Sequence, residues 1–187
     1  IEEKVLFLSQ LVLTLSVYGA NINFINPIAD MLQTVSMIIL FVAGFLNVLR
    51  NKIKKNEALV LFVVFIVSIL VTSTSGNATI AYYAILIAVF YKRSIKKVLL
   101  RDIIVKILTV LFVIASYSLG QTVVNNDIYR GHEIRQALGF AHPNILGALT
   151  VVIFSEFTVL FNFRNNKVKY LLLLTAIVPI LVVSDSR

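Results

Sequence analysis

Long apolar runs, interrupted by short polar segments, make up most of this chain. Most of the runs have roughly the 17 to 25 residues that an α-helix needs to cross the about 30 Å hydrocarbon core of a bilayer. The pattern predicts about seven transmembrane helices, at 4–20, 28–49, 58–74, 75–91, 103–119, 145–163 and 170–183. The runs lack the strict alternation of a membrane barrel, so the expected fold class is an all-α, polytopic membrane helix bundle.

The boundary between the third and fourth predicted helices is open to two interpretations. The polar, uncharged stretch 72–77 is either a tight hairpin outside the membrane or a break within it. At the ends of the chain, Ile1 stands where a methionine is usual, and Arg187 follows shortly after an apolar run. We therefore expect residues 1–187 to form a single, incomplete transmembrane domain whose C-terminal part is missing.

The composition predicts the same class. Of the 187 residues, 59% are hydrophobic and 14% are charged, and the mean hydropathy is +0.93, which lies outside the range of soluble globular domains. The absence of cysteine excludes disulfides, thiolate nucleophiles and sulfur-ligated metals from this portion. The absence of a glycine-rich phosphate loop argues against a nucleotide-driven pump.

The basic residues predict the orientation. The net charge is +8, and the segments 50–55, 92–106 and 164–169 carry most of the 17 lysines and arginines. Because such residues are retained on the cytoplasmic side, we expect a cytoplasmic N-terminus and an outward loop at about 119–144. The charge is then mostly a topology signal, and no nucleic-acid partner is expected. The segment 92–106 is interpreted as a basic helix lying on anionic membrane lipid, with a plain loop as the alternative.

The outward loop leads into a charged, turn-rich island at 130–147, which reads R-G-H-E-I-R-Q-A-L-G-F-A-H-P-N-I-L-G. Basic residues are disfavoured on the outer side, so Arg130 and Arg135 need a reason. One hypothesis is that their guanidinium groups bind a lipid pyrophosphate bidentately. The other is that they pair with Asp127 and Glu133, which would leave a nearly neutral loop.

The histidines of the island give no metal motif. His132 and Glu133 lack the second histidine that zinc proteases place four residues on, because residue 136 is glutamine. His132, Glu133 and His142 are candidate ligands, but their irregular spacing favours solvated side chains, and no metal is expected.

His142-Pro143-Asn144 is interpreted as the start of the sixth predicted helix. Asparagine is a good N-terminal cap, and a proline before it fixes the direction in which the chain enters the helix. The sequence therefore predicts a structural role for this tripeptide, with Asn144 as the cap.

A stripe of small and polar residues follows at helical spacing and is expected to face other helices: Asn144, Gly147, Val151, Ser155, Thr158 and Asn162. Glu156 lies beside it. A carboxylate inside the membrane costs roughly 2.5 to 3.5 kcal/mol on insertion scales, which makes Glu156 a candidate functional residue. The alternative is a protonated, hydrogen-bonded contact between helices.

Several of these residues together resemble a known family. Arg135, the run 139–144, Gly147 and the terminal Ser184-Asp185-Ser186-Arg187 are similar to the Wzy-type O-antigen and capsular polysaccharide polymerases of the O-antigen ligase-like superfamily. The layout of the chain is similar to the N-terminal portion of such a protein. In that family a large outward loop follows the S-x-S-R element.

The resemblance implies a glycosyltransferase that joins undecaprenyl-pyrophosphate-linked oligosaccharide repeat units into a surface polysaccharide on the outer face of the cytoplasmic membrane. It implies no cofactor and no obligatory metal. By position, Arg130, Arg135 and Arg187 would neutralise the leaving pyrophosphate. His142 and Asn144 would shape the substrate pocket, and His142 is also the candidate catalytic base. The implied partners are the lipid-linked glycan, membrane lipid, a flippase and chain-length regulator proteins.

Two other kinds of protein stay open. An O-antigen ligase differs chiefly in its acceptor, which these residues do not reveal. A secondary transporter would explain the many spans, Glu156 and the polar stretch near Gly76. Against it, the chain shows no repeated halves with broken helices at matching positions.

Overall fold

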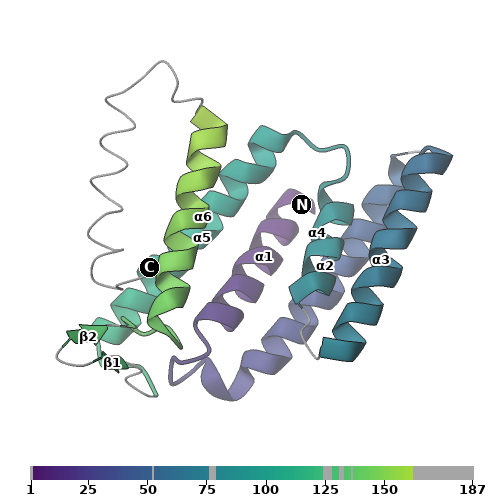
Figure 1. The fold of residues 1–187 in the computed structure, drawn as a ribbon. Helices are drawn as coiled ribbons and strands as arrows, with labels where there is room; N and C mark the ends of the chain where they lie inside the picture. The colour runs from purple at the N-terminus through teal and green to yellow at the C-terminus, as the bar shows by residue number, and fades with distance from the viewer. Residues whose placement is uncertain are drawn as a thin grey trace. The chain divides into compact units, whose positions relative to one another are not determined.

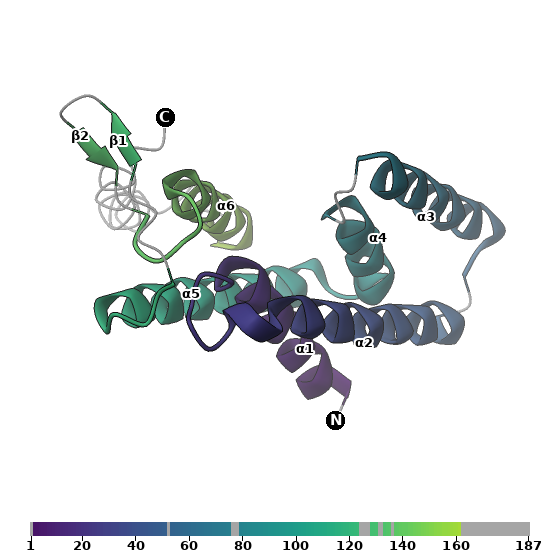
Figure 2. The same cartoon turned by 90° about the horizontal axis from the view of Figure 1, so that it is seen from below.

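The computed structural model describes residues 2–51, 53–75, 79–123, 128–130, 133–135 and 137–161 (Figures 1 and 2). Its helices are α1 (Glu2–Tyr18), the 3-10 turn η1 (Asn26–Ile28), α2 (Ala29–Arg50), α3 (Lys55–Ser75), α4 (Thr79–Phe90), α5 (Ile95–Ser118) and α6 (Pro143–Phe161). Two short antiparallel strands, β1 (Ile128–Arg130) and β2 (Glu133–Arg135), form a hairpin between α5 and α6. The predicted helical fold class is therefore confirmed over the described residues.

Among the described residues, two helical segments are long and apolar enough to cross a membrane. They are the 25 residues Asn26–Arg50, which join η1 and α2, and the 20 residues Lys55–Thr74 of α3. The apolar part of α6, Asn144–Leu160, is shorter. α4 has 12 residues and is shorter than the helix predicted at 75–91. At 1.5 Å per residue it is about 18 Å long, which is less than the about 30 Å thickness of the hydrocarbon core. The helix predicted at 170–183 lies outside the described residues.

The chain divides into two compact units. The first combines residues 1–10 with 34–98, and the second combines 11–33 with 99–187. α1, α2 and α5 each contribute to both units, because each division falls inside a helix.

In the first unit, α2 packs closely against α4 at Gly44. A Cβ at this position would lie 3.2 Å from the Cβ of Ala88 and 3.2 Å from the backbone nitrogen of Val89, so a larger residue would force the helices apart. About one turn further along α2, Asn47 donates from Nδ2 to the carbonyls of Ala88 (3.1 Å) and Tyr91 (3.0 Å). This side chain therefore caps the C-terminal end of α4.

α3 and α4 also pack side by side in the first unit, as both views show (Figures 1 and 2). The polar residues before the connection belong to the last turn of α3. Ser73 and Thr74 donate to the carbonyl of Leu70 at 2.8 and 2.9 Å. α3 continues unbroken to Ser75, and residues 76–78 lie outside the described residues, so both interpretations of 72–77 stay open.

The core of the second unit lies where the turn after α1, the middle of α5 and the start of α6 meet. Its buried hydrophobic residues are Ile22, Ile25, Ala29, Val110, Val113, Phe140, Leu146 and Leu149. Gly139 lets the chain pass close to α5: its φ is +89°, and a Cβ there would lie 2.9 Å from the Cβ of Tyr117. Glycine adopts this left-handed conformation without steric cost, so it delivers Phe140 into the core.

Two backbone hydrogen bonds join distant segments of the same unit. Asn23 donates to the carbonyl of Gln121 at 2.9 Å, and Val123 donates to the carbonyl of Asn21 at 2.8 Å. The segment after α1 is thus joined to the segment after α5, where the hairpin begins.

Candidate functional site

His142 precedes α6 and caps its N-terminus. Its Nδ1 accepts a hydrogen bond from the backbone N–H of Asn144 at 3.1 Å, and its carbonyl accepts one from Ile145 at 3.0 Å. Pro143 is the first helical residue, where the missing N–H loses no hydrogen bond. The helix start is confirmed. The prediction of Asn144 as the cap is wrong, because Asn144 already lies in the first turn and its own N–H needs the cap.

The capping bond bears on the proposed chemistry of His142. A ring nitrogen that accepts a hydrogen bond carries no proton, so the proton of the neutral imidazole lies on Nε2. In this arrangement the half-buried ring can donate a hydrogen bond from Nε2, while the lone pair of Nδ1 accepts the hydrogen bond from the first turn of α6. To act as a general base, as the sequence resemblance implies, His142 would first have to release the cap.

Arg130 and Arg135 both lie in the hairpin. The register pairs Arg130 with Glu133 and Ile128 with Arg135. The backbone thus brings Glu133 opposite Arg130, as the neutral-loop hypothesis requires for one of its two pairs. It also leaves the two arginines two register positions apart. Arg187 lies outside the described residues, so its predicted contribution stays a prediction.

A charged cluster of Asp102, Lys106 and Glu156 joins α5 to α6. Lys106 Nζ donates to a carboxylate oxygen of Asp102, one turn earlier in α5, and to Oε1 of Glu156. The three side chains are 23%, 15% and 14% exposed, in that order. The hydrogen-bonded contact given as one alternative for Glu156 is thus present, with a lysine as the partner.

The cluster is rich in acidic groups. Asp102 and Glu156 share the ammonium group of Lys106, and Oε2 of Glu156 is buried and accepts no hydrogen bond. A carboxylate oxygen buried in this way is costly where water is scarce. The arrangement therefore suits either a structural pair between helices or a group that binds and releases a proton.

Asp102 was not predicted from the sequence, and Lys106 was expected on the lipid surface with the rest of the segment 92–106. In the structure, α5 runs unbroken from Ile95, so most of that segment is the first part of the helix. Lys106 binds protein partners there, because two carboxylates satisfy its charge better than lipid contact would. The spacing of four residues between Asp102 and Lys106 was the available signal.

The small and polar stripe of α6 does not form a buried face over the described residues. Val151 is 50% exposed, and Ser155 is also exposed. Ser155 and Thr158 donate to carbonyls of their own helix at 2.9 and 2.7 Å, so their hydroxyls need no neighbouring helix. The prediction is therefore wrong for Val151 and Ser155, whereas Gly147 is buried as predicted, and Asn162 lies outside the described residues. The buried residues of α6 are Leu146, Gly147, Leu149 and Thr150.

The described residues contain no group of three or more His, Cys, Asp or Glu side chains placed to hold a metal ion. No protein-family model matches the chain, and neither the curated proteins nor the solved structures contain a match to it. The function is therefore inferred from the residues described above.

Proposed function

We propose that this chain is the N-terminal portion of a cytoplasmic-membrane polymerase that joins undecaprenyl-pyrophosphate-linked oligosaccharide repeat units into a surface polysaccharide. The hairpin that carries Arg130 and Arg135 is the observation that supports the proposal most. It stands between two helices in a chain that is otherwise strongly apolar. After the hairpin, Gly139 lets the chain pass close to α5, and Phe140 is buried in the core of the second unit.

The proposed topology has about seven membrane-spanning helices, a cytoplasmic N-terminus and the hairpin on the outer side. The apolar lengths of α2 and α3 support membrane insertion. The basic segments 50–55, 92–97 and 164–169 support the orientation. The hairpin would then lie on the side where lipid-linked repeat units are polymerised.

The proposed reaction transfers a glycan from its lipid carrier. The acceptor hydroxyl of one repeat unit attacks the anomeric carbon of another, a glycosidic C–O bond forms, and the C–O bond to pyrophosphate breaks. The bonding electrons and a growing negative charge pass to undecaprenyl pyrophosphate, and the hydroxyl proton is taken up by a base. Arg130, Arg135 and Arg187 would stabilise that leaving group by charge-assisted hydrogen bonds worth about 1.5 to 3 kcal/mol each.

The start of α6 would support the same ligand. The N-terminus of a helix carries partial positive charge and favours anions. His142 can donate from Nε2 while its Nδ1 keeps the cap, and Asn144 lies in the first turn beside it. We therefore expect these two residues to orient the donor rather than to move its protons.

The test replaces the hairpin arginines in the producing cell. We expect Arg130→Ala and Arg135→Ala to stop polymer growth, with single lipid-linked repeat units accumulating and the protein still present in the membrane. Arg→Lys at the same positions should restore little polymer, because an ammonium group lacks the bidentate fork. Arg50→Ala, at the end of α2, is the matched control. Long polymer on a gel from both hairpin alanine variants would overturn the proposal. If that long polymer is made but is not transferred to its acceptor, the protein would instead be a ligase.

The charged cluster supports a second candidate, a secondary transporter, because ionisable residues inside membrane helices often form proton pathways. Glu156→Gln keeps the shape and the hydrogen bonding but cannot ionise. Normal polymer from Glu156→Gln and none from Arg130→Ala would favour the polymerase. Normal polymer from Arg130→Ala, with loss of function in Glu156→Gln, would favour the transporter.

A further inference from the structure

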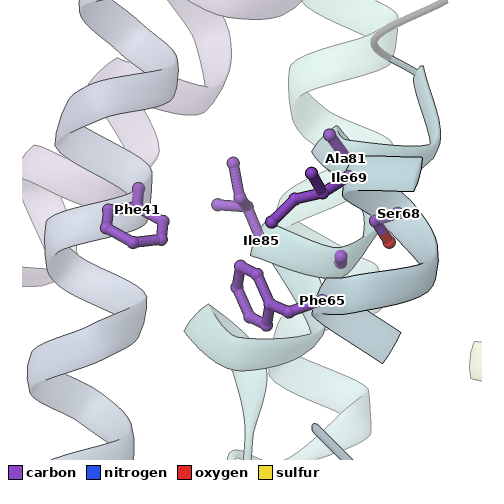
Figure 3. A pocket seen from close by; sticks show the side chains of 7 residues that line it. Phe41, Phe65, Ser68, Ile69, Ala81 and Ile85 are labelled. Carbon is purple, nitrogen blue, oxygen red and sulfur yellow. The ribbon is translucent and has the colours of Figure 1, made fainter. Parts of the chain in front are cut away.

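A cavity of about 200 Å³ lies between α2, α3 and α4 in the first unit. Its walls include Phe41 of α2, Phe65, Ser68 and Ile69 of α3, and Ala84 and Ile85 of α4. Figure 3 shows Phe41 on one side of the cavity, facing Ile85 and Phe65 on the other. The two phenyl rings are arranged edge to face, with their centroids 6.0 Å apart.

The chemistry of the walls excludes water as a stable occupant. The volume equals about seven waters at liquid density, but a buried water needs two to four polar partners. The hydroxyl of Ser68 already donates to the carbonyl of Val64 at 2.6 Å, and the other wall residues named above are hydrocarbon side chains. A cavity of this kind takes up apolar molecules.

The position of the cavity along the helices indicates where the apolar molecule comes from. Phe41 lies 12 residues after Ala29 and 9 before Arg50 in α2, and Phe65 lies 10 residues from each end of α3. At 1.5 Å per residue, both are about 13 to 18 Å from the helix ends. Both belong to helices that, within the part of the chain that the structure describes, are long and apolar enough to span a membrane. Their middles would lie in the hydrocarbon core, where lipid chains are the only abundant occupant.

We propose that this cavity binds one acyl chain of a bilayer phospholipid as a resident lipid. Only 6% of the membrane-spanning window in α3 is buried within the described protein, so most of the surface of this helix is exposed. A bound chain would extend the contact of α3 with α2 and α4 on the side of the cavity. The site is separate from the hairpin and does not depend on the proposed polymerase activity.

The test uses phospholipid that carries a photoreactive diazirine in the middle of one acyl chain, with the full chain in lipid nanodiscs. Crosslinks are mapped by mass spectrometry at Ile85, which is 8% exposed and lines the cavity, and at Leu59, which is 63% exposed and reports ordinary surrounding lipid. We expect crosslinks at both positions in the unmodified protein. Crosslinks at Leu59 alone would overturn the proposal.

Variants that fill the cavity separate a bound chain from incidental contact. Ala84→Phe and Ala81→Phe place a ring in the cavity, whereas Ala148→Phe makes the same change at an exposed position of α6. We expect the two filling variants to lower the ratio of Ile85 to Leu59 crosslinks by at least about tenfold and the control to leave it unchanged. An unchanged ratio in a filling variant that retains its helical content would overturn the proposal.

The opposite change protects the test against variants that fail to fold. Phe65→Ala removes a ring from the wall and enlarges the cavity, so it should keep the Ile85 crosslink or increase it. Loss of that crosslink in Phe65→Ala, or its replacement by a crosslinked second copy of the protein, would contradict a bound acyl chain.

Discussion

Lys106→Met isolates the contribution of the charged cluster to the packing of α5 against α6. Methionine has nearly the length of lysine and a similar helix propensity, so the local helix is preserved. The change removes the ammonium group that Asp102 and Glu156 share. Both carboxylates lie in a largely buried space, where the loss of that group is costly.

The size of the effect follows from the burial of the three side chains. Removing one partner of a fully buried ion pair costs about 3 to 5 kcal/mol, while a fully exposed pair contributes about 0.2 to 1 kcal/mol. Asp102, Lys106 and Glu156 are between 14% and 23% exposed, which is closer to the buried case. We therefore expect Lys106→Met to lower the free energy of unfolding by about 2 to 4 kcal/mol, or roughly thirtyfold or more in the equilibrium constant.

The assay is equilibrium unfolding in mixed micelles, followed by circular dichroism. Lys96→Met provides the control, since Lys96 is exposed on the same helix. A triple variant with Asp102→Asn, Lys106→Met and Glu156→Gln removes all the charges, and it should recover most of the lost stability. The reasoning is refuted if Lys106→Met is no less stable than Lys96→Met, or if the triple variant is as unstable as Lys106→Met alone.

Two further predictions concern the topology and the backbone. Because the chain has no cysteine, a single cysteine at Asn125 should react with an impermeant thiol reagent in intact protoplasts, whereas one at Asn51 should not; the reverse labelling would overturn the orientation. Gly139→Ala should lower the free energy of unfolding by about 1 to 3 kcal/mol, because its φ is +89° and the new methyl group would meet Tyr117. Gly120→Ala should cost less, since its φ is +68° but no atom lies within 4 Å; equal losses in denaturant titrations would argue against the packing role of Gly139.

The helices could be predicted from the sequence because their apolar runs are long. The predicted ranges 28–49 and 58–74 match α2 (Ala29–Arg50) and α3 (Lys55–Ser75) to within a few residues. α4 was harder, because the polar junction before it left its start undefined. α5 begins eight residues before the predicted start at 103, since the basic residues that precede the apolar run are good helix formers and continue the helix.

The candidate site was less predictable, because its details depend on contacts between distant residues. The alternatives for Glu156 could be stated from the sequence, but its partner Lys106 is 50 positions away. The cap of α6 was assigned to the better capping residue type, whereas the chain places His142 at the position that a cap must occupy. The prediction that the stripe of α6 faces other helices was wrong in part, because the spacing of the residues does not show whether a hydroxyl is satisfied by its own helix.

The two candidate functions depend on residues at different positions along α6. Glu156 lies 13 residues after Pro143, so it is about 20 Å along the helix from His142 and the adjoining island. A pyrophosphate at the start of α6, as proposed, would be too small to reach the charged cluster as well. Variants of the arginines and of Glu156 therefore test different ligands. If both abolished the same activity, the cause would have to pass through the packing of α5 and α6, and the stability of Lys106→Met would measure how strong that coupling is.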